Sequence, residues 1–196
     1  AVGQYILSGS QNFLLMDAIS QSLAGRVAIR HLPPLSYCEV KAAGRQPESV
    51  EAWVVRGGYP RLYDIDMAPA EYYSNYIQTY IDRDVRSELG VVKIPEFNRF
   101  VTLCATRIGN LVNIQSLAAD CGINMRTAKD WLALLEQSFI IRLLRPYHHN
   151  YGKRLIKTPK LYFFDTGLVC YLTRYSSPEI LMNGAIKGAV LENYVV

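Results

Sequence analysis

Apolar and polar positions follow a helical period over much of the second half of the chain. Between residues 71 and 89, apolar and aromatic side chains recur at three- and four-residue steps, which predicts one amphipathic helix. The same period returns from Phe97 to Ile108, where Pro95 suits a first helical turn. We therefore expect a mostly α protein of the α+β class.

A short helix, a tight turn and a longer helix are predicted between residues 113 and 137. Asn113 and Asn124 can each cap a helix, and Gly122 can form the turn between the two helices. After Ser138 the period changes, and the segments FIIRLLR and KLYFF are typical of strands joined by a polar loop. Three helices followed by a β-hairpin match a winged helix-turn-helix, which we place at residues 91–173.

The first half of the chain is less regular. Residues 2–7 are typical of a central strand, a helix is expected over 13–22, and a second short strand over 27–29. Residues 46–70 form a connector that contains RGGYPRLY, where two glycines and a proline disfavour a helix.

The formal net charge of +4 is unevenly distributed. Residues 126–160 contain eight basic and two acidic side chains, a local charge of +6 that leaves −2 for the rest of the chain. Such an excess can attract phosphate, although a solvated surface has the same signature.

A basic set lies where the third helix of this unit begins and in the hairpin loop. Arginine, threonine and lysine at the start of such a helix can reach base edges or phosphates of double-stranded DNA. The residues expected to contact nucleic acid are Asn124, Arg126, Thr127, Lys129, Lys153 and Arg154. The alternative is a protein-interaction or oligomerisation module, which would pack on a sister subunit or another protein.

Several other classes of function find little support in the sequence. No apolar run has the length of a membrane span, and four cysteines without CxxC spacing are typical of buried thiols in a reducing cytoplasm. The adjacent His148 and His149 have no suitably spaced third ligand, so no metal site is expected. No GxxxxGK[ST] motif occurs, so we expect no ATP hydrolysis and no catalytic residue in this chain.

The order of several short motifs resembles the prokaryotic AAA-type ATPases that carry a C-terminal domain of unknown function, DUF 4143. The matching segments are YILSGSQNFLL, SLAGR, LPPLSYCEV, GGYPRLY, YYSNYIQTYIDRDV and KTPKLYFFDTGL. The resemblance implies that the chain is a fragment of a longer ATPase without its phosphate-binding loop. Residues 1–45 would then be the end of an α/β ATPase core, and 46–90 a helical lid or connector.

The same resemblance implies roles for individual residues. Ser10 would sense the γ-phosphate of the nucleotide, and Arg26 would act near phosphate as a sensor or finger, with an ion pair as its structural alternative. ATP and Mg²⁺ would be bound only by the intact protein. Residues 174–196 would be a linker and the start of a truncated nuclease-like domain, whose first helix carries Glu192.

Overall fold

The computed structural model describes residues 6, 26, 28–80, 85, 93–147 and 157–196. They belong to two units, Ala1–Leu32 and Pro33–Val196. In the first unit, residues 28 and 29 are described and are not in a strand, unlike the strand expected at 27–29. The strand expected at 2–7, apart from Ile6, and the helix expected at 13–22 lie outside the described residues.

The second unit is mostly helical, as expected. Its helices are α2 (Tyr37–Ala42), α3 (Val50–Arg56), α4 (Arg61–Asp64), α5 (Pro69–Tyr80), α6 (Ile94–Thr106), α7 (Ile114–Cys121), α8 (Met125–Gln137), α10 (Thr166–Leu172), α11 (Pro178–Met182) and α12 (Lys187–Val195). Its two strands are β1 (Ile141–Leu144) and β2 (Lys160–Phe163). None of the helices in the described ranges has the length and apolarity that a bilayer crossing requires.

The segment around RGGYPRLY differs from the prediction. Two short helices flank the glycines, because Ser49 caps α3 with its side chain and Gly57 ends it with a φ of 84°. Helix α4 then begins directly after Pro60, whose fixed φ suits a helix start. The tyrosine-rich helix begins at Pro69 and is described as far as Tyr80, so the rest of its predicted range lies outside the described residues.

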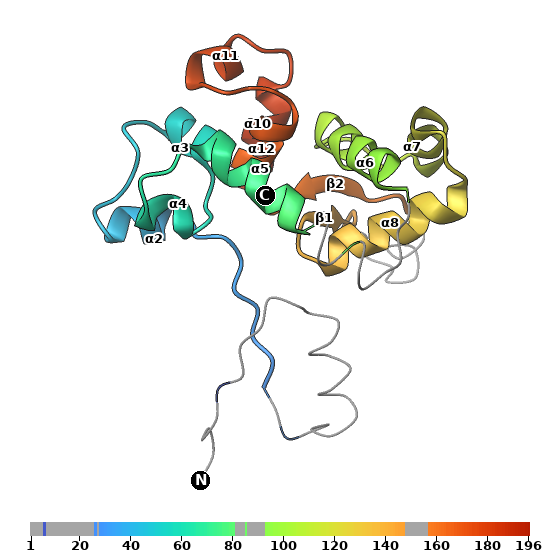
Figure 1. Cartoon of the computed structure of the whole chain (residues 1–196), viewed down its shortest axis with the longest axis horizontal. Coiled ribbons are helices and arrows are strands. Elements are labelled where there is room, and N and C mark those ends of the chain that lie inside the picture. The colour runs from blue at the N-terminus through green and yellow to red at the C-terminus, as the bar shows by residue number, and fades with distance from the viewer. Residues whose placement is uncertain (1–5, 7–25, 27, 81–84, 86–92, 148–156) are drawn as a thin grey trace. The chain divides into compact units, whose positions relative to one another are not determined.

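Helices α6, α7 and α8 form a bundle around buried aromatic rings (Figure 1). Trp131 of α8 packs edge-on against Phe97 and Phe100 of α6, with ring centroids 5.2 and 5.4 Å apart. Both predicted caps are confirmed: Asn113 accepts from the Ser116 N–H and Asn124 from the Thr127 N–H. Gly122, with a φ of 69°, makes the turn between α7 and α8 in open space, as expected.

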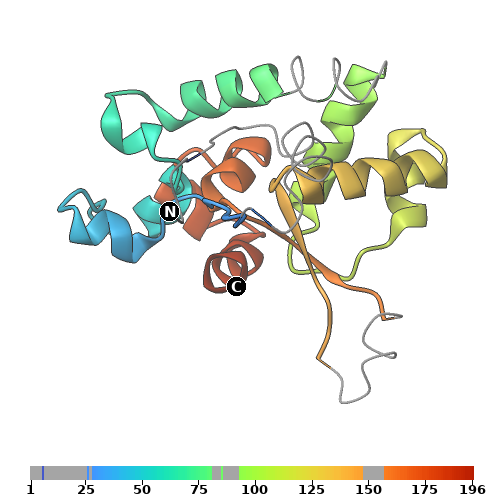
Figure 2. The ribbon, with the colours of Figure 1, turned by 90° about the horizontal axis from the view of Figure 1, so that it is seen from below.

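The two strands form an antiparallel ribbon in which Ile141 is opposite Phe163 and Leu144 is opposite Lys160. Figure 2 shows them side by side, extending away from the helices. Strand β1 begins two residues later than FIIRLLR suggested, because Phe139 has a φ of 56°, which no strand residue adopts.

A third segment, residues 109–112, turns at Gly109 and lies along the other edge of β2. The Gly109 N–H donates to the Leu161 carbonyl at 2.8 Å, and the Leu161 N–H donates to the Asn110 carbonyl at 3.1 Å. The Val112 N–H donates to the Pro159 carbonyl at 2.9 Å. The sequence analysis missed this segment, which places β2 between 109–112 and β1.

The last helix completes the same edge of β2. The Asn193 side chain accepts from the Phe163 N–H at 2.7 Å and donates to the Phe163 carbonyl at 2.9 Å. The Asn193 amide therefore takes the place of a strand residue beside Phe163, which lies beyond the part of β2 that residues 109–112 cover. Because Asn193 is buried, α12 is part of the packed unit that begins at Pro33.

Candidate functional site

The exposed surface of α8 is the part of the described chain that best matches the predicted interface. Arg126 and Lys129 are exposed, whereas Thr127 is half-buried. The opposite side of the helix, which includes Trp131 and Leu135, is buried against the bundle. The helical period therefore separates a basic surface from an apolar one, as the pattern predicted.

The other predicted site residues are not gathered there by the described structure. Asn124 lies at the start of α8, but its side-chain oxygen is engaged in capping at 2.7 Å from the Thr127 nitrogen. Arg26 belongs to the first unit and is exposed. Ser10, Lys153 and Arg154 lie outside the described residues, so their predicted roles stay predictions.

Charge along α8 changes from its beginning to its end. Arg126 and Lys129 occupy its first turns, Asp130 lies beside them, and the exposed Glu136 lies near its end. The positive end of the helix dipole coincides with the two basic side chains. An anionic partner would therefore be attracted to the N-terminal half of α8 more than to its C-terminal half.

The tyrosine-rich helix presents its rings to the interior. Tyr73 is fully buried, and Tyr59 packs against Tyr72, Tyr73 and Tyr76 with ring centroids 4.9–6.0 Å apart. The Tyr59 hydroxyl donates to the Tyr76 hydroxyl at 2.9 Å. Tyr73 is thus part of the core, and the half-buried Tyr59, Tyr72 and Tyr76 pack around it.

Asp165 is a buried carboxyl that the sequence analysis did not single out. Its Oδ2 accepts from the Gly58 N–H at 2.6 Å, and its Oδ1 accepts from the Leu168 N–H at 2.7 Å and from the Tyr73 hydroxyl at 2.6 Å. Burial raises the pKa of Asp165, and the hydrogen bonds from Tyr73 and the backbone offset only part of that rise. These three donors, two backbone N–H groups and one tyrosine hydroxyl, carry no positive charge.

Gly57 is required beside this carboxyl. A Cβ at Gly57 would lie 2.0 Å from the Tyr73 hydroxyl oxygen and 2.6 Å from Asp165 Oδ1. Gly57 therefore allows Asp165 and Tyr73 to approach the backbone closely. We interpret this group as a structural junction between α3, α5 and α10.

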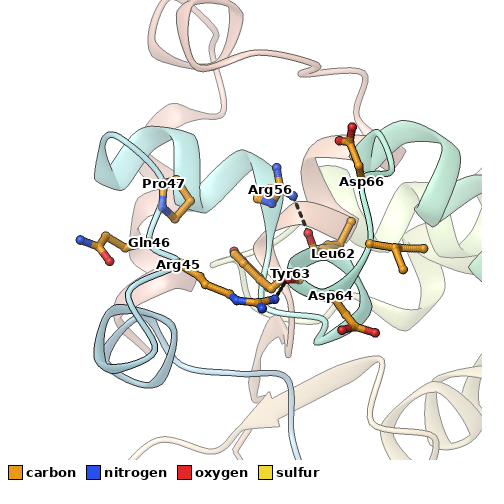
Figure 3. Close-up of a pocket in the computed structure, with 9 residues that line it drawn as sticks. Arg45, Gln46, Pro47, Arg56, Leu62, Tyr63, Asp64 and Asp66 are labelled. Carbon is orange, nitrogen blue, oxygen red and sulfur yellow. Dashed lines mark hydrogen bonds between the residues drawn. The ribbon is translucent and has the colours of Figure 1, made fainter.

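A shallow pocket of about 470 Å³ lies between the α2–α3 loop and α4 (Figure 3). The Arg45 and Arg56 guanidinium groups point at α4, where they donate to the carbonyl oxygens of Tyr63 and Leu62 respectively. Arginines that bond the last carbonyls of a helix act as its C-terminal cap. The pocket is accordingly a capped helix end, with Asp64 and Asp66 on its wall.

The cysteines form no disulfide, and no three His, Cys, Asp or Glu side chains in the described ranges converge on a point that could hold a metal. Cys104, Cys121 and Cys170 are buried, as expected, whereas Cys38 is exposed. Cys38 lies on the outer side of the short helix α2, in which only Val40 is buried.

Comparison with known families shows which family the chain belongs to. A family model described as "Domain of unknown function (DUF8612)" matches residues 47–179, well over half of the chain. The chain belongs to this DUF8612 family. The match begins before α3 and ends in α11, so it includes the Asp165 junction and the whole α6–β2 region.

This finding corrects the resemblance to AAA-type ATPases with DUF 4143, which was wrong. The motifs behind that resemblance are short, and several of them, such as GGYPRLY and LYFFDTGL, supply the packing around Asp165. Similar packing needs can produce similar short segments without a shared function. The ATP and Mg²⁺ sites expected in a longer protein stay predictions without that support.

Two mycobacterial relatives match nearly the whole chain. They are the uncharacterized proteins Rv2008c of Mycobacterium tuberculosis and Mb2031c of Mycobacterium bovis, each 30% identical over 197 residues. The match covers 98% of this chain and 43% of each relative, so the chain spans less than half of their length. No solved structure matched the chain significantly.

Proposed function

We propose that residues 93–163 form a winged helix-turn-helix that binds double-stranded DNA through the N-terminal half of α8. The observation that carries this proposal is the exposure of Arg126 and Lys129 opposite a buried apolar stripe. A helix anchored in this way offers its basic side chains to a partner without losing packing.

The order of elements supports the same proposal. Along the chain, a helix (α6) is followed by the short segment 109–112, two helices (α7 and α8) and a two-stranded ribbon. Segment 109–112, β2 and β1 are hydrogen-bonded in that spatial order. Helix-turn-helix proteins place the second helix of the motif, here α8, in the major groove.

The distribution of aromatic rings favours a duplex over a single strand. Proteins that bind single strands stack successive bases on accessible aromatic side chains. Here Tyr59, Tyr72, Tyr73 and Tyr76 pack against one another, with Tyr73 buried and the others half-buried. A basic helix surface suits the phosphates and groove of a duplex instead.

The experiment is a titration of a short mixed-sequence DNA duplex at about 50 mM and about 200 mM salt. We expect affinity to fall steeply with salt, because each phosphate contact releases counterions. Replacing Arg126 and Lys129 together (R126A/K129A) should weaken binding about tenfold or more and reduce the salt slope by about two units.

The matched control removes the same charge elsewhere. Lys41 of α2 and Lys187 of α12 are exposed and lie outside the α6–β2 region, so K41A/K187A should bind nearly as well as the wild-type chain. Equal losses in the two double variants would show that only net charge matters. Absence of duplex binding at low salt, together with a mass that rises with protein concentration, would favour the protein-interaction alternative.

A further inference from the structure

Glu192 of α12 holds a lysine of the proposed winged helix. Its Oε1 accepts from Lys160 Nζ at 2.8 Å and from the Tyr162 hydroxyl. Lys160 is the first residue of β2, and it faces Leu144 of β1 and Leu111 of the edge segment. The carboxylate therefore lies over a basic residue on one face of the sheet.

The backbone at Gly109 and the neighbouring Asn193 lie beside this contact. Gly109 has a φ of 73°, and the Glu192 carboxylate lies 3.5 Å from the position that a Cβ would occupy there. The neighbouring Asn193 is buried and bonded to both backbone groups of Phe163, which fixes this turn of α12 against β2. The pair is thus positioned by the fold on both sides, whereas a chance surface pair has no such support.

Both partners remain accessible to an incoming ligand. The Lys160 and Glu192 side chains are 44% and 43% exposed. A lysine paired with a carboxylate contributes no net charge to the local field and would have to leave that partner to neutralise a phosphate. A second basic side chain of the sheet also bonds to this end of the chain, since the Arg142 guanidinium of β1 donates to the Val196 carbonyl at 3.3 Å.

Resting on the proposed function, we propose that Glu192 is an affinity-limiting residue that withholds Lys160 from the DNA backbone. Helix α12 thereby reduces the number of phosphate contacts that the sheet can add to those of α8. Neutralising Glu192 frees Lys160 as one further phosphate ligand, and the nucleic-acid surface then extends from α8 onto the start of β2.

The test compares E192Q with the wild-type chain in the same duplex titration. Glutamine keeps an oxygen that can accept from Tyr162 but removes the charge. We expect E192Q to bind the duplex about threefold to tenfold more tightly at about 50 mM salt, with a salt slope steeper by about 0.9. The gain should disappear in the double variant K160A/E192Q.

The control is E179Q, which removes one exposed carboxylate from α11 and changes the net charge equally. Equal affinities for E192Q and E179Q, or a gain that survives in K160A/E192Q, would overturn the inference. Failure of the proposed function would give another result: the wild-type chain would not bind the duplex, or R126A/K129A would bind the duplex as well as the wild-type chain does. Thermal melts of each variant identify any change caused by unfolding.

Discussion

At the scale of single residues, the hydroxyl of Tyr73 has two possible acceptors and one hydrogen. It lies 2.6 Å from Asp165 Oδ1 and 3.0 Å from the Arg56 carbonyl. The hydroxyl donates to Asp165 Oδ1, the nearer acceptor, and this hydrogen bond keeps the pKa of Asp165 lower than burial alone would set it.

Replacing Asp165 by asparagine should destabilise the fold. Each carboxyl oxygen accepts from a backbone N–H, Oδ1 from Leu168 and Oδ2 from Gly58, so an amide nitrogen fits at neither position. We expect D165N to lower the free energy of unfolding by about 2–3 kcal/mol in urea titrations. The exposed Asp64 provides the control, since D64N should change the free energy of unfolding by less than about 0.5 kcal/mol.

The D165N penalty should also depend on pH. The folded pKa of Asp165 lies above its ordinary value of 3.8, so the folded state keeps its proton to higher pH than the unfolded chain does. The stabilisation from this group is complete below the unfolded pKa and is lost as pH rises through the folded pKa. The stability difference between wild type and D165N should therefore shrink as pH rises above the ordinary pKa of 3.8 and through the higher folded pKa. A difference that widens with pH would mean that the carboxylate form is the one the site prefers.

At the scale of elements, features that depend on nearby residues were predictable. Asn113, Gly122 and Asn124 act on groups within a few positions of themselves, so the sequence pattern identified both caps and the turn. The short segment 109–112 was missed because four residues are too few to carry a periodic signal. Its strand character comes from β2, about fifty positions away in sequence.

Side chains that bridge distant segments escaped prediction for the same reason. Asp165 bonds Gly58 across 107 positions, and Asn193 bonds Phe163 across 30. Nothing in the local pattern around either residue distinguishes it from an ordinary helix cap or a surface amide. The basic surface of α8 was predictable because its period and its charges lie within one helix.

The contact between α12 and β2 can be tested by removing the Asn193 amide. In N193A the buried N–H and carbonyl of Phe163 lose their partner, so we expect a loss of about 2–4 kcal/mol in the free energy of unfolding. The control is N183A on α11, where the exposed amide donates to the Glu179 carbonyl of its own helix. A loss in N193A no larger than in N183A would show that α12 does not complete the sheet.

At the scale of the described unit, α10 connects its parts. This helix packs on α3, α5, α6, α12 and β2, and its residues Thr166–Cys170 are buried. The α6–β2 region therefore shares a core with α3 and α5, and α8 is supported within that region by α7 and β1. An interface on a supported helix loses little conformational entropy when it binds.

The most direct test of the account is to map the duplex on the molecule by NMR. With the isotope-labelled chain and a short DNA duplex, we expect the largest amide shift changes at residues 124–130 of α8, with little change in α2–α4. Changes concentrated on α3 and α11, or no changes at α8 under conditions where the duplex is bound, would contradict the proposal that α8 is the nucleic-acid interface.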